Sequence, residues 1–398
     1  MLLKNRSSNR LATVRGLALF YPLIMRSFVL LLLLCVPSSG WAQSAQSSAG
    51  DADEYLRRGV DAQQRGDAAT AIDDYRKALA IRPQMADARA NLGAALAATG
   101  QFDAAIEEYR RALVNAPDKT AVRMNLALAY YKKGDFEHAK PEFAAVHAAR
   151  PNDLAAAMLL GYSEVKLNQG AEAVALLKPM EPGREANMDF EFVLASALIA
   201  SGREAEGLPR MEKVARATRS PDAYVIAGSA RLHRREFKEA RADLDAALEL
   251  DPKIPGLYTL AGQARDALGD TDAAQSAFEN ALRADPRDPT ANLYLGTIRL
   301  KQRDLENARP LLELALQLQP DNPQARLQVA KLDAMTGKNT EAVALLEALE
   351  KGDPNWLEPH VELAPLYYKL HRPEDGQRER DLVDQIQAKQ QQAGPPKD

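Results

Sequence analysis

Residues 86–119 read ADARANLGAALAATGQFDAAIEEYRRALVNAPDK, and this stretch decides the fold. Apolar or small residues recur at helical spacing up to Ala97, and a second apolar face begins at Phe102. Gly100 separates the two faces, and Pro117 follows the second one. Because Gly and Pro end helices, the stretch predicts two helices of about 12 residues joined by a tight turn.

The same pattern returns along most of the chain. Ten positions spaced by 34 residues, with one interval of 33, are all alanine or glycine: Ala71, Ala105, Ala139, Ala173, Gly207, Ala240, Ala274, Ala308, Ala342 and Gly376. Short helices are marginal alone and must pack on a neighbour, and only a small side chain fits where two axes approach to about 8–10 Å. The sequence therefore predicts an all-α solenoid of about ten helix-turn-helix repeats.

At these residues the chain resembles the tetratricopeptide repeat (TPR) family. The matching positions in the quoted stretch are Leu92-Gly93, Gly100, Phe102, Ala105-Ile106, Tyr109, Ala112-Leu113 and Pro117. The resemblance covers residues 52–389. It implies a right-handed α-solenoid whose repeats begin near residues 52, 86, 120, 154, 188, 221, 255, 289, 323 and 357.

Two regions depart from the repeat pattern. In the fourth repeat, Pro179 and Pro182 are expected to end the second helix early. In the last repeat, Arg380 takes the place of the packing aromatic, and Gln377, Arg378 and Glu379 precede it. A terminal repeat needs a polar outer face, so we expect this repeat to be a cap.

The first 42 residues have the pattern of a secretory signal peptide. An apolar run over residues 27–36 follows a basic start, and a small-x-small end predicts cleavage after Ala42. Met25 is an alternative natural start. We expect export to the periplasm or the extracellular space. The alternatives are an uncleaved membrane anchor and lipid attachment at Cys35.

Polar, small residues flank the repeats, and they predict a flexible linker over residues 43–51 and a disordered tail over residues 390–398. The formal net charge is −4, and cleavage would remove five basic residues and no acidic ones, which leaves −9. An acidic surface repels nucleic acid and anionic lipid. We therefore expect no nucleic-acid partner, and membrane contact only through an uncleaved signal segment.

Motifs for catalysis, cofactors or metals are missing from the sequence. There is no glycine-rich phosphate loop, zinc-protease motif or nucleophile elbow, and Gly269-Asp270-Thr271-Asp272 is interpreted as a helix N-cap and not a calcium loop. One cysteine and scattered histidines predict neither a disulfide nor a metal site. We expect these histidines to be solvated: His138, His147, His233, His360 and His371. The sequence therefore predicts a protein that is not an enzyme and binds no cofactor.

The resemblance implies a binding site on the concave face formed by the first helices. In the family, ligand contacts come from the second, fifth, sixth, ninth and twelfth places of each repeat. Carried onto this chain, those places give the candidate residues Asn91, Met124, Asn125, Leu128, Tyr131, Met158, Tyr162, Val165, Phe192 and Ile199. Met and aromatic side chains favour an amphipathic or apolar partner segment. The alternative is that they only pack one repeat against the next.

Two further features of the family bear on the partner. Asn91 and Asn125 occupy the sixth place of consecutive repeats, which resembles the asparagine ladder that holds an extended peptide backbone. The clamp that other members use for a peptide carboxylate needs cations at places where this chain has Leu56, Ala90, Met124 and Met158. A carboxylate clamp is therefore not expected there.

The leading hypothesis is an exported, non-catalytic scaffold or adaptor that binds a peptide segment or a partner protein in its concave groove. One alternative is a structural subunit of an envelope polysaccharide- or protein-secretion assembly. A third is an enzyme or its regulatory arm. The identity of the partner and the oligomeric state stay open.

Overall fold

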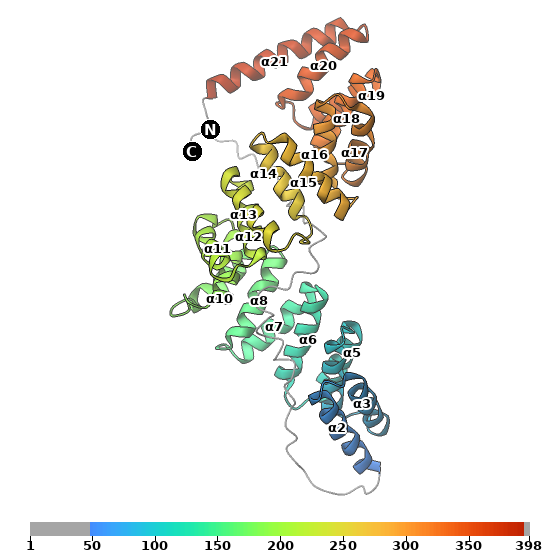
Figure 1. Cartoon of the computed structure of the whole chain (residues 1–398), viewed down its shortest axis with the longest axis vertical. Coiled ribbons are helices and arrows are strands. Elements are labelled where there is room, and N and C mark those ends of the chain that lie inside the picture. The colour runs from blue at the N-terminus through green and yellow to red at the C-terminus, as the bar shows by residue number, and fades with distance from the viewer. Residues whose placement is uncertain (1–47, 394–398) are drawn as a thin grey trace. The chain divides into compact units, whose positions relative to one another are not determined.

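The computed structural model describes residues 48–393, and every regular element in that range is a helix (Figure 1). The helices alternate along the chain as the first and second helices of ten consecutive repeats. The first helices are α2 (Ser48–Gln64), α4 (Ala86–Ala98), α6 (Lys119–Lys133), α8 (Leu154–Lys166), α10 (Met188–Ala200), α12 (Pro221–His233), α14 (Leu257–Ala267), α16 (Pro289–Lys301), α18 (Pro323–Met335) and α20 (Leu357–Lys369). The second helices are α3 (Ala68–Ile81), α5 (Phe102–Asn115), α7 (Phe136–Ala149), α9 (Gly170–Leu177), α11 (Glu204–Thr218), α13 (Phe237–Leu250), α15 (Thr271–Ala284), α17 (Leu305–Leu318), α19 (Asn339–Gly352) and α21 (Pro373–Ala393). The all-α prediction is confirmed for the described residues, and the right-handed sense stays a prediction.

The described residues divide into two compact parts, 48–230 and 231–393, with the division inside α12. We call them the N-terminal part and the C-terminal part. In the N-terminal part, α5 packs against its hairpin partner α4 and against α6 of the next hairpin. In the C-terminal part, α17 packs in the same way against α16 and α18. Packing between nearest neighbours is the arrangement of a repeat array.

Small residues lie where the two helices of a hairpin cross. Eight alanines of the repeating series are fully buried: Ala71, Ala105, Ala139, Ala173, Ala240, Ala274, Ala308 and Ala342. The first helices are equally constrained, because a Cβ added to Gly93 would lie 2.8 Å from Cε1 of Tyr109. A Cβ added to Gly262 would lie 2.5 Å from Cε1 of Phe278. The alanine and glycine pattern in the sequence therefore reflects close helix packing.

The turn inside each hairpin needs a left-handed backbone. Glycine supplies it in six repeats, for example at Gly100 with φ 78°. In the other four repeats the same turn carries Asn168, Arg235, Arg303 and His371, with φ between 57° and 64°. Such φ values are unfavourable for most residues that carry a Cβ. Packing of the helices on either side, more than local preference, fixes these four turns.

The structure corrects the inner end of each expected flanking segment. Residues 48–51, at the end of the expected linker 43–51, form the first turn of α2. Residues 390–393, at the start of the expected tail 390–398, form the last turn of α21. Residues 48–51 and 390–393 thus extend the adjoining helices, and the glutamines and alanine at the end of α21 are acceptable helix formers.

Other sequence predictions fall outside the structure. The expected signal peptide 1–42, together with residues 43–47 and 394–398, lies outside the described residues. Of the helices that are described, none is both long enough and apolar enough to cross a bilayer.

The fourth hairpin is irregular, as its prolines predict. Helix α9 ends at Leu177, and the 3-10 helix η2 (Lys178–Met180) follows it and contains Pro179. Proline lacks an N–H and cannot continue the α-helical hydrogen-bond pattern. The first helices on either side, α8 and α10, pack directly on each other as well as on α9. This direct contact decides how the predicted groove residues of the N-terminal part are placed.

Candidate functional site

The predicted groove residues lie on α4, α6, α8 and α10, and most of them are buried. Seven have less than a tenth of their surface exposed: Asn91, Met124, Leu128, Tyr131, Met158, Tyr162 and Phe192. Asn125, Val165 and Ile199 are half-buried. The structure therefore corrects the expectation that these side chains project into an open groove. Their contact with a partner stays a prediction.

The buried aromatics among them form a row across three first helices. The ring centroids of Tyr131 and Tyr162 are 5.7 Å apart, and those of Tyr162 and Phe192 are 6.5 Å apart. Phe136 and Phe143 of α7 extend the row, with ring centroids 5.5 Å and 6.2 Å from that of Tyr131. Aromatic pairs at these separations stabilise a core. The row therefore packs repeats three to five against one another.

Burial also controls the chemistry of the two tyrosines. Removal from water raises the pKa of the Tyr131 phenol, and the neighbouring Tyr162 raises it further. Burial likewise raises the pKa of Tyr162, to which the charge of Asp222 adds. Both phenols are therefore neutral under all ordinary conditions. They act as large apolar side chains and not as acids or bases.

An accessible recess in the N-terminal part lies beside this core. Its volume is about 550 Å³, and its lining includes Ala94, Ala97, Ala98, Phe102, Leu128 and Lys132. These residues come from the ends of α4 and α6 and the start of α5. Small apolar side chains give it a smooth wall that suits an apolar group.

The C-terminal part has a recess of a different kind on α16, α18 and α20. Its volume is about 610 Å³. Four cations are among its described lining residues: Lys301, Arg303, Lys331 and Lys369. Glu362 is the single acidic side chain among the described residues that line it, and it pairs with Lys331 Nζ at 3.4 Å. The recess is therefore positive, although the whole chain has a net charge of −4.

Sequence reasoning did not find this basic recess. Lys301 and Lys369 occupy the thirteenth place of their repeats, whereas Lys331 occupies the ninth. A search in steps of 34 residues aligns Lys301 with Lys369 but does not align Lys331 with either of them. They converge because neighbouring first helices present different places to the same recess. The available signal was the recurrence of a lysine at the thirteenth place in Lys301 and Lys369.

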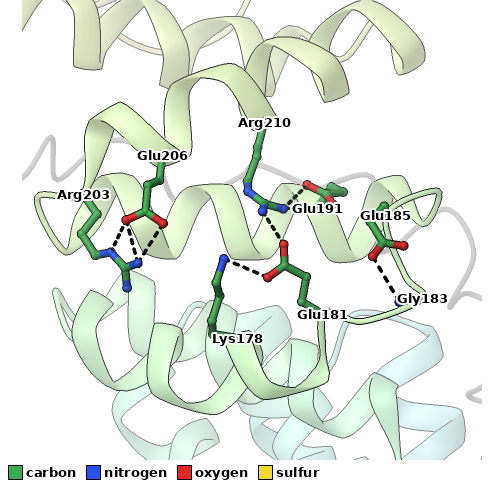
Figure 2. A network of polar contacts seen from close by, with 8 residues as sticks. All are labelled: Lys178, Glu181, Gly183, Glu185, Glu191, Arg203, Glu206 and Arg210. Carbon is green, nitrogen blue, oxygen red and sulfur yellow. Dashed lines mark hydrogen bonds and ion pairs between the residues drawn. The ribbon is translucent and has the colours of Figure 1, made fainter.

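A polar network joins the fifth hairpin to the segment before it (Figure 2). The Arg210 guanidinium on α11 donates to the buried Glu191 carboxylate of α10, with an Nη1 to Oε2 distance of 3.0 Å, and also donates to Glu181. Lys178 Nζ lies 2.8 Å from the second Glu181 oxygen. Hydrogen bonds from Lys178 and Arg210 hold the pKa of Glu181 below its usual value. The network fixes the irregular segment and leaves Arg210 fully paired.

Figure 2 also shows Arg203 and Glu206, which pair within the first turn of α11 at 2.8 Å. Both side chains are largely exposed to solvent. Exposed ion pairs contribute little to stability. This pair is separate from the Arg210 bridge and places no group for chemistry.

The structure corrects one expectation about the histidines. His360 on α20 has only 1% of its surface exposed and lies against the buried Glu379 of α21. Glu379 was expected on the polar outer face of the cap. Its neighbour Arg380 does face solvent, with its guanidinium 4.7 Å from the centre of the Tyr368 ring. The position of α21 turns one polar side chain inward and the next outward.

The helix cap predicted in place of a calcium loop is confirmed. Asp270 precedes α15, and its Oδ1 accepts a hydrogen bond from the Ala273 backbone N–H at 3.3 Å. Asp153 caps α8 in the N-terminal part in the same way, through Ala156 N–H at 3.1 Å. Both aspartates satisfy backbone donors that a helix start leaves free.

Comparison with known proteins bears on the family. One tetratricopeptide repeat profile matches residues 56–120, 192–255 and 259–323, and a second matches residues 97–161 and 299–360. Together they span most of the described chain. No curated protein matches the sequence.

Several solved structures align with this one at low TM-scores. Yeast Tom70 is 15% identical over 88% of this chain and 98% of that chain, with a TM-score of 0.35. YrrB, described as a TPR protein with an unusual peptide-binding site, is 25% identical over 45% of this chain and 92% of that chain, with a TM-score of 0.38. A tetratricopeptide repeat protein from Parabacteroides merdae is 15% identical over 71% of this chain and 99% of that chain, with a TM-score of 0.38. These superpositions are too loose to carry an assignment, which rests on the two profiles and the buried repeat positions. The chain belongs to the tetratricopeptide repeat family.

Proposed function

We propose that the chain is an exported, non-catalytic scaffold that binds an acidic, extended peptide segment of a partner protein on the first helices of its C-terminal part. Tetratricopeptide repeats form a scaffold for binding proteins or peptides. The observation that carries the finer proposal is the recess on α16, α18 and α20, where four cations face one acid.

Exposure favours this recess over the predicted groove in repeats three to five. Lys301, Arg303 and Lys369 are exposed, whereas Tyr131 and Phe192 are buried in the core. A partner reaches exposed lysines without displacing any packing. Concave walls that carry one sign of charge concentrate ligands of the opposite sign. An acidic segment is therefore the partner that this surface fits.

Anisotropy measurements with fluorescent peptides test the proposal. The full chain is titrated against an aspartate- and glutamate-rich peptide and against a peptide of the same length with neutral amides. We expect saturable binding of the acidic peptide only, weakened by added salt because salt screens exposed charges. The double substitution Lys301→Ala with Lys369→Ala should abolish that binding.

The matched control is Lys338→Ala, which removes an exposed lysine at the start of α19, outside the recess. It changes the net charge but should leave binding intact apart from a small general effect. Equal loss in Lys338→Ala and in the recess variants would point to non-specific attraction. Binding that survives both recess substitutions would reject this surface.

The proposed export is supported by the apolar run and the small-x-small end near Ala42. Cell fractionation followed by N-terminal sequencing tests it, and the expected first residue of the exported chain is Gln43. A chain recovered from the cytoplasm with its N-terminal segment intact would contradict export. Co-purification with envelope secretion components would favour the subunit role over a free scaffold.

A further inference from the structure

Three side chains from three helices meet in the last two hairpins. Glu350 comes from the end of α19, His360 from the start of α20 and Glu379 from the middle of α21. One ligand atom of each lies within 4.8 Å of the other two. His360 and Glu379 are almost fully buried, with 1% and 4% of their surface exposed, and Glu350 is half-buried. We call these residues the Glu-His-Glu cluster.

The hydrogen bonds of His360 decide which ring nitrogen faces the carboxylates. Nε2 lies 3.1 Å from the Pro354 carbonyl oxygen, which can only accept, so Nε2 carries a hydrogen and donates. Nδ1 is therefore the nitrogen that faces Glu379, at 2.6 Å from Oε2. In a neutral imidazole this Nδ1 presents a lone pair to a negative oxygen. A positive charge, either a proton or a metal ion, must lie between them.

The fifth repeat contains the same arrangement with a different cation. Glu181, Glu191 and Arg210 are separated by 10 and 19 residues, and so are Glu350, His360 and Glu379. There the Arg210 guanidinium bridges both carboxylates, as Figure 2 shows. Its charge is permanent, and Lys178, whose Nζ lies 2.8 Å from Glu181, supplies the second positive charge that balances the two carboxylates.

In the last repeat, the three corresponding places are Glu350, His360 and Glu379, so no permanent positive charge is among them. Two places carry carboxylates, and the third carries an imidazole, which supplies at most one positive charge and only when protonated. The guanidinium that acts on Glu350, that of Arg378, hydrogen-bonds Asp375. One buried and one half-buried carboxylate facing one lone pair make a site for a divalent cation, which neutralises both charges.

We propose that the Glu-His-Glu cluster binds one divalent first-row metal ion, of the Zn²⁺ or Mn²⁺ class, through Nδ1 of His360 and one carboxylate oxygen each of Glu350 and Glu379. Imidazole and carboxylate ligands together suit this class of metal. Donor atoms on one tetrahedral Zn²⁺, bound at about 2.0–2.2 Å, lie about 3.3–3.6 Å apart. The 2.6 Å contact between His360 Nδ1 and Glu379 Oε2 must therefore lengthen slightly, and Glu350 must approach, for all three to bind one ion. The half-buried Glu350 leaves an entry path and room for water as a further ligand.

The bond from Nε2 to a backbone carbonyl supports the same conclusion. A histidine that ligates a metal typically donates its other N–H to a carbonyl or carboxylate, which fixes the ring and its tautomer. Pro354 performs that role here. The metal would tie α19, α20 and α21 together at the end of the array.

Metal titration of the full chain, purified without a histidine tag and stripped by a chelator, tests the proposal. Calorimetry with Zn²⁺ and with Mn²⁺ near neutral pH should show one equivalent bound, and Co²⁺ should give a visible absorption band from an ordered site. Bound metal should also raise the melting temperature, because it binds only the folded chain. Lack of saturable binding up to about 1 mM metal would overturn the proposal.

Two variants separate the metal site from a plain ion pair. The first variant, His360→Arg, introduces the residue that the second repeat has at this place, Arg89. Arg89 donates to the Pro83 carbonyl and pairs with Glu108 at 2.8 Å, so an arginine fits these surroundings. The variant should fold, keep its melting temperature without metal and lose the metal response. Glu350→Gln keeps the pair between His360 and Glu379 while removing one ligand. Each affinity should fall by more than about 100-fold, since loss of an outer-shell partner alone costs about 10–100-fold.

The matched control is Glu181→Gln, which changes the corresponding carboxylate of the fifth repeat. It should leave metal binding unchanged. Binding that survives both His360→Arg and Glu350→Gln would assign the metal to one of the four other histidines and reject the cluster. A melting temperature that responds equally to metal in all variants would do the same.

Discussion

The ninth place of the repeat has opposite roles in the two parts of the molecule. In α8 it is Tyr162, which is buried and lies between Tyr131 and Phe192. In α18 it is Lys331, which is half-buried, pairs with Glu362 and lines the basic recess. The ninth place is thus core on α8 and accessible surface on α18.

This difference shows that the repeat backbone does not depend on the chemistry of its inner face. Fully buried alanines at the helix crossings are the same in both parts, for example Ala139 and Ala308. The crossing residues set the fold, and the inner face is free to carry packing or binding. Substitutions on the inner face should therefore cost stability in one part and binding in the other.

The largest expected effect is that of Phe192→Ala. Removing this buried ring should lower the free energy of unfolding by about 3–5 kcal/mol, because it leaves a cavity among the first helices. Lys331→Ala, the matched change in the C-terminal part, should cost within about 0.5 kcal/mol. Urea unfolding followed by circular dichroism measures both, and equal losses would contradict the comparison.

The same variants test whether the two parts unfold separately. The chain has two tryptophans, so Trp41→Phe leaves Trp356 as the only fluorescent reporter, and it lies in the C-terminal part. Repeat arrays lose structure by segments and not in one step. Phe192→Ala should therefore shift the circular dichroism transition and leave the Trp356 transition in place. A shared shift would indicate one cooperative unit.

The next largest effect concerns the crossings, which should behave alike in both parts. Gly93→Ala places a methyl against Tyr109, and Gly262→Ala places one against Phe278. Each should cost about 1–3 kcal/mol, since neither ring has room to move within its packed hairpin. Gly352→Ala is the control, because nothing lies within 4 Å of its added Cβ. A loss in one part only would show that the crossings are not equivalent.

Helix caps should give a smaller effect, again equal in the two parts. Asp153→Ala and Asp270→Ala each remove a hydrogen bond to a helix start, at α8 and at α15. Each should cost about 1 kcal/mol, and replacement by asparagine should restore most of it. Thermal unfolding of the two pairs of variants measures this. If the two alanine variants lost different amounts of stability, the N-terminal and C-terminal parts would differ in their helix caps as well as in their inner faces.

The smallest expected effect on stability depends on pH and concerns the acidic residue at the eleventh place of two repeats, Glu164 and Asp333. Glu164 is buried, and burial raises its pKa above 4.5, although Lys140 at 4.0 Å partly opposes this. The folded chain therefore holds a proton that the unfolded chain releases, and stability falls as the pH rises through the raised pKa. Glu164→Gln should be more stable than the parent near neutral pH. The gain should vanish below about pH 4.5, as unfolding across a pH series would show.

The corresponding residue of the C-terminal part gives the matched comparison. Asp333 is equally buried, but its Oδ1 accepts a hydrogen bond from Arg309 Nη1 at 3.1 Å. Asp333→Asn should therefore lower the stability near neutral pH, because it weakens a charge-assisted hydrogen bond. A gain in stability at both positions would mean that pairing does not distinguish the two parts.

Much of the fold could be predicted from the sequence because its causes are local or periodic. The stretch containing Gly93, Ala105 and Tyr109 fixes the hairpin, since only small residues fit the crossing. Pro179 ends α9 early because proline cannot donate a hydrogen bond. The turns at Arg303 and His371 were less evident, since their left-handed backbone is imposed by the helices they join.

The sequence by itself determined the repeats, the crossings and the caps, because each follows from side-chain size, backbone freedom or a hydrogen bond a few residues away. Only the tertiary structure decided which inner-face residues are buried. The direct packing of α8 on α10 buries Phe192, and adjacent first helices bring Lys331 and Lys369 to one recess. The tertiary structure alone brings His360 of α20 against Glu379 of α21. The charges around a side chain depend on how the helices pack, and the sequence pattern does not give that packing.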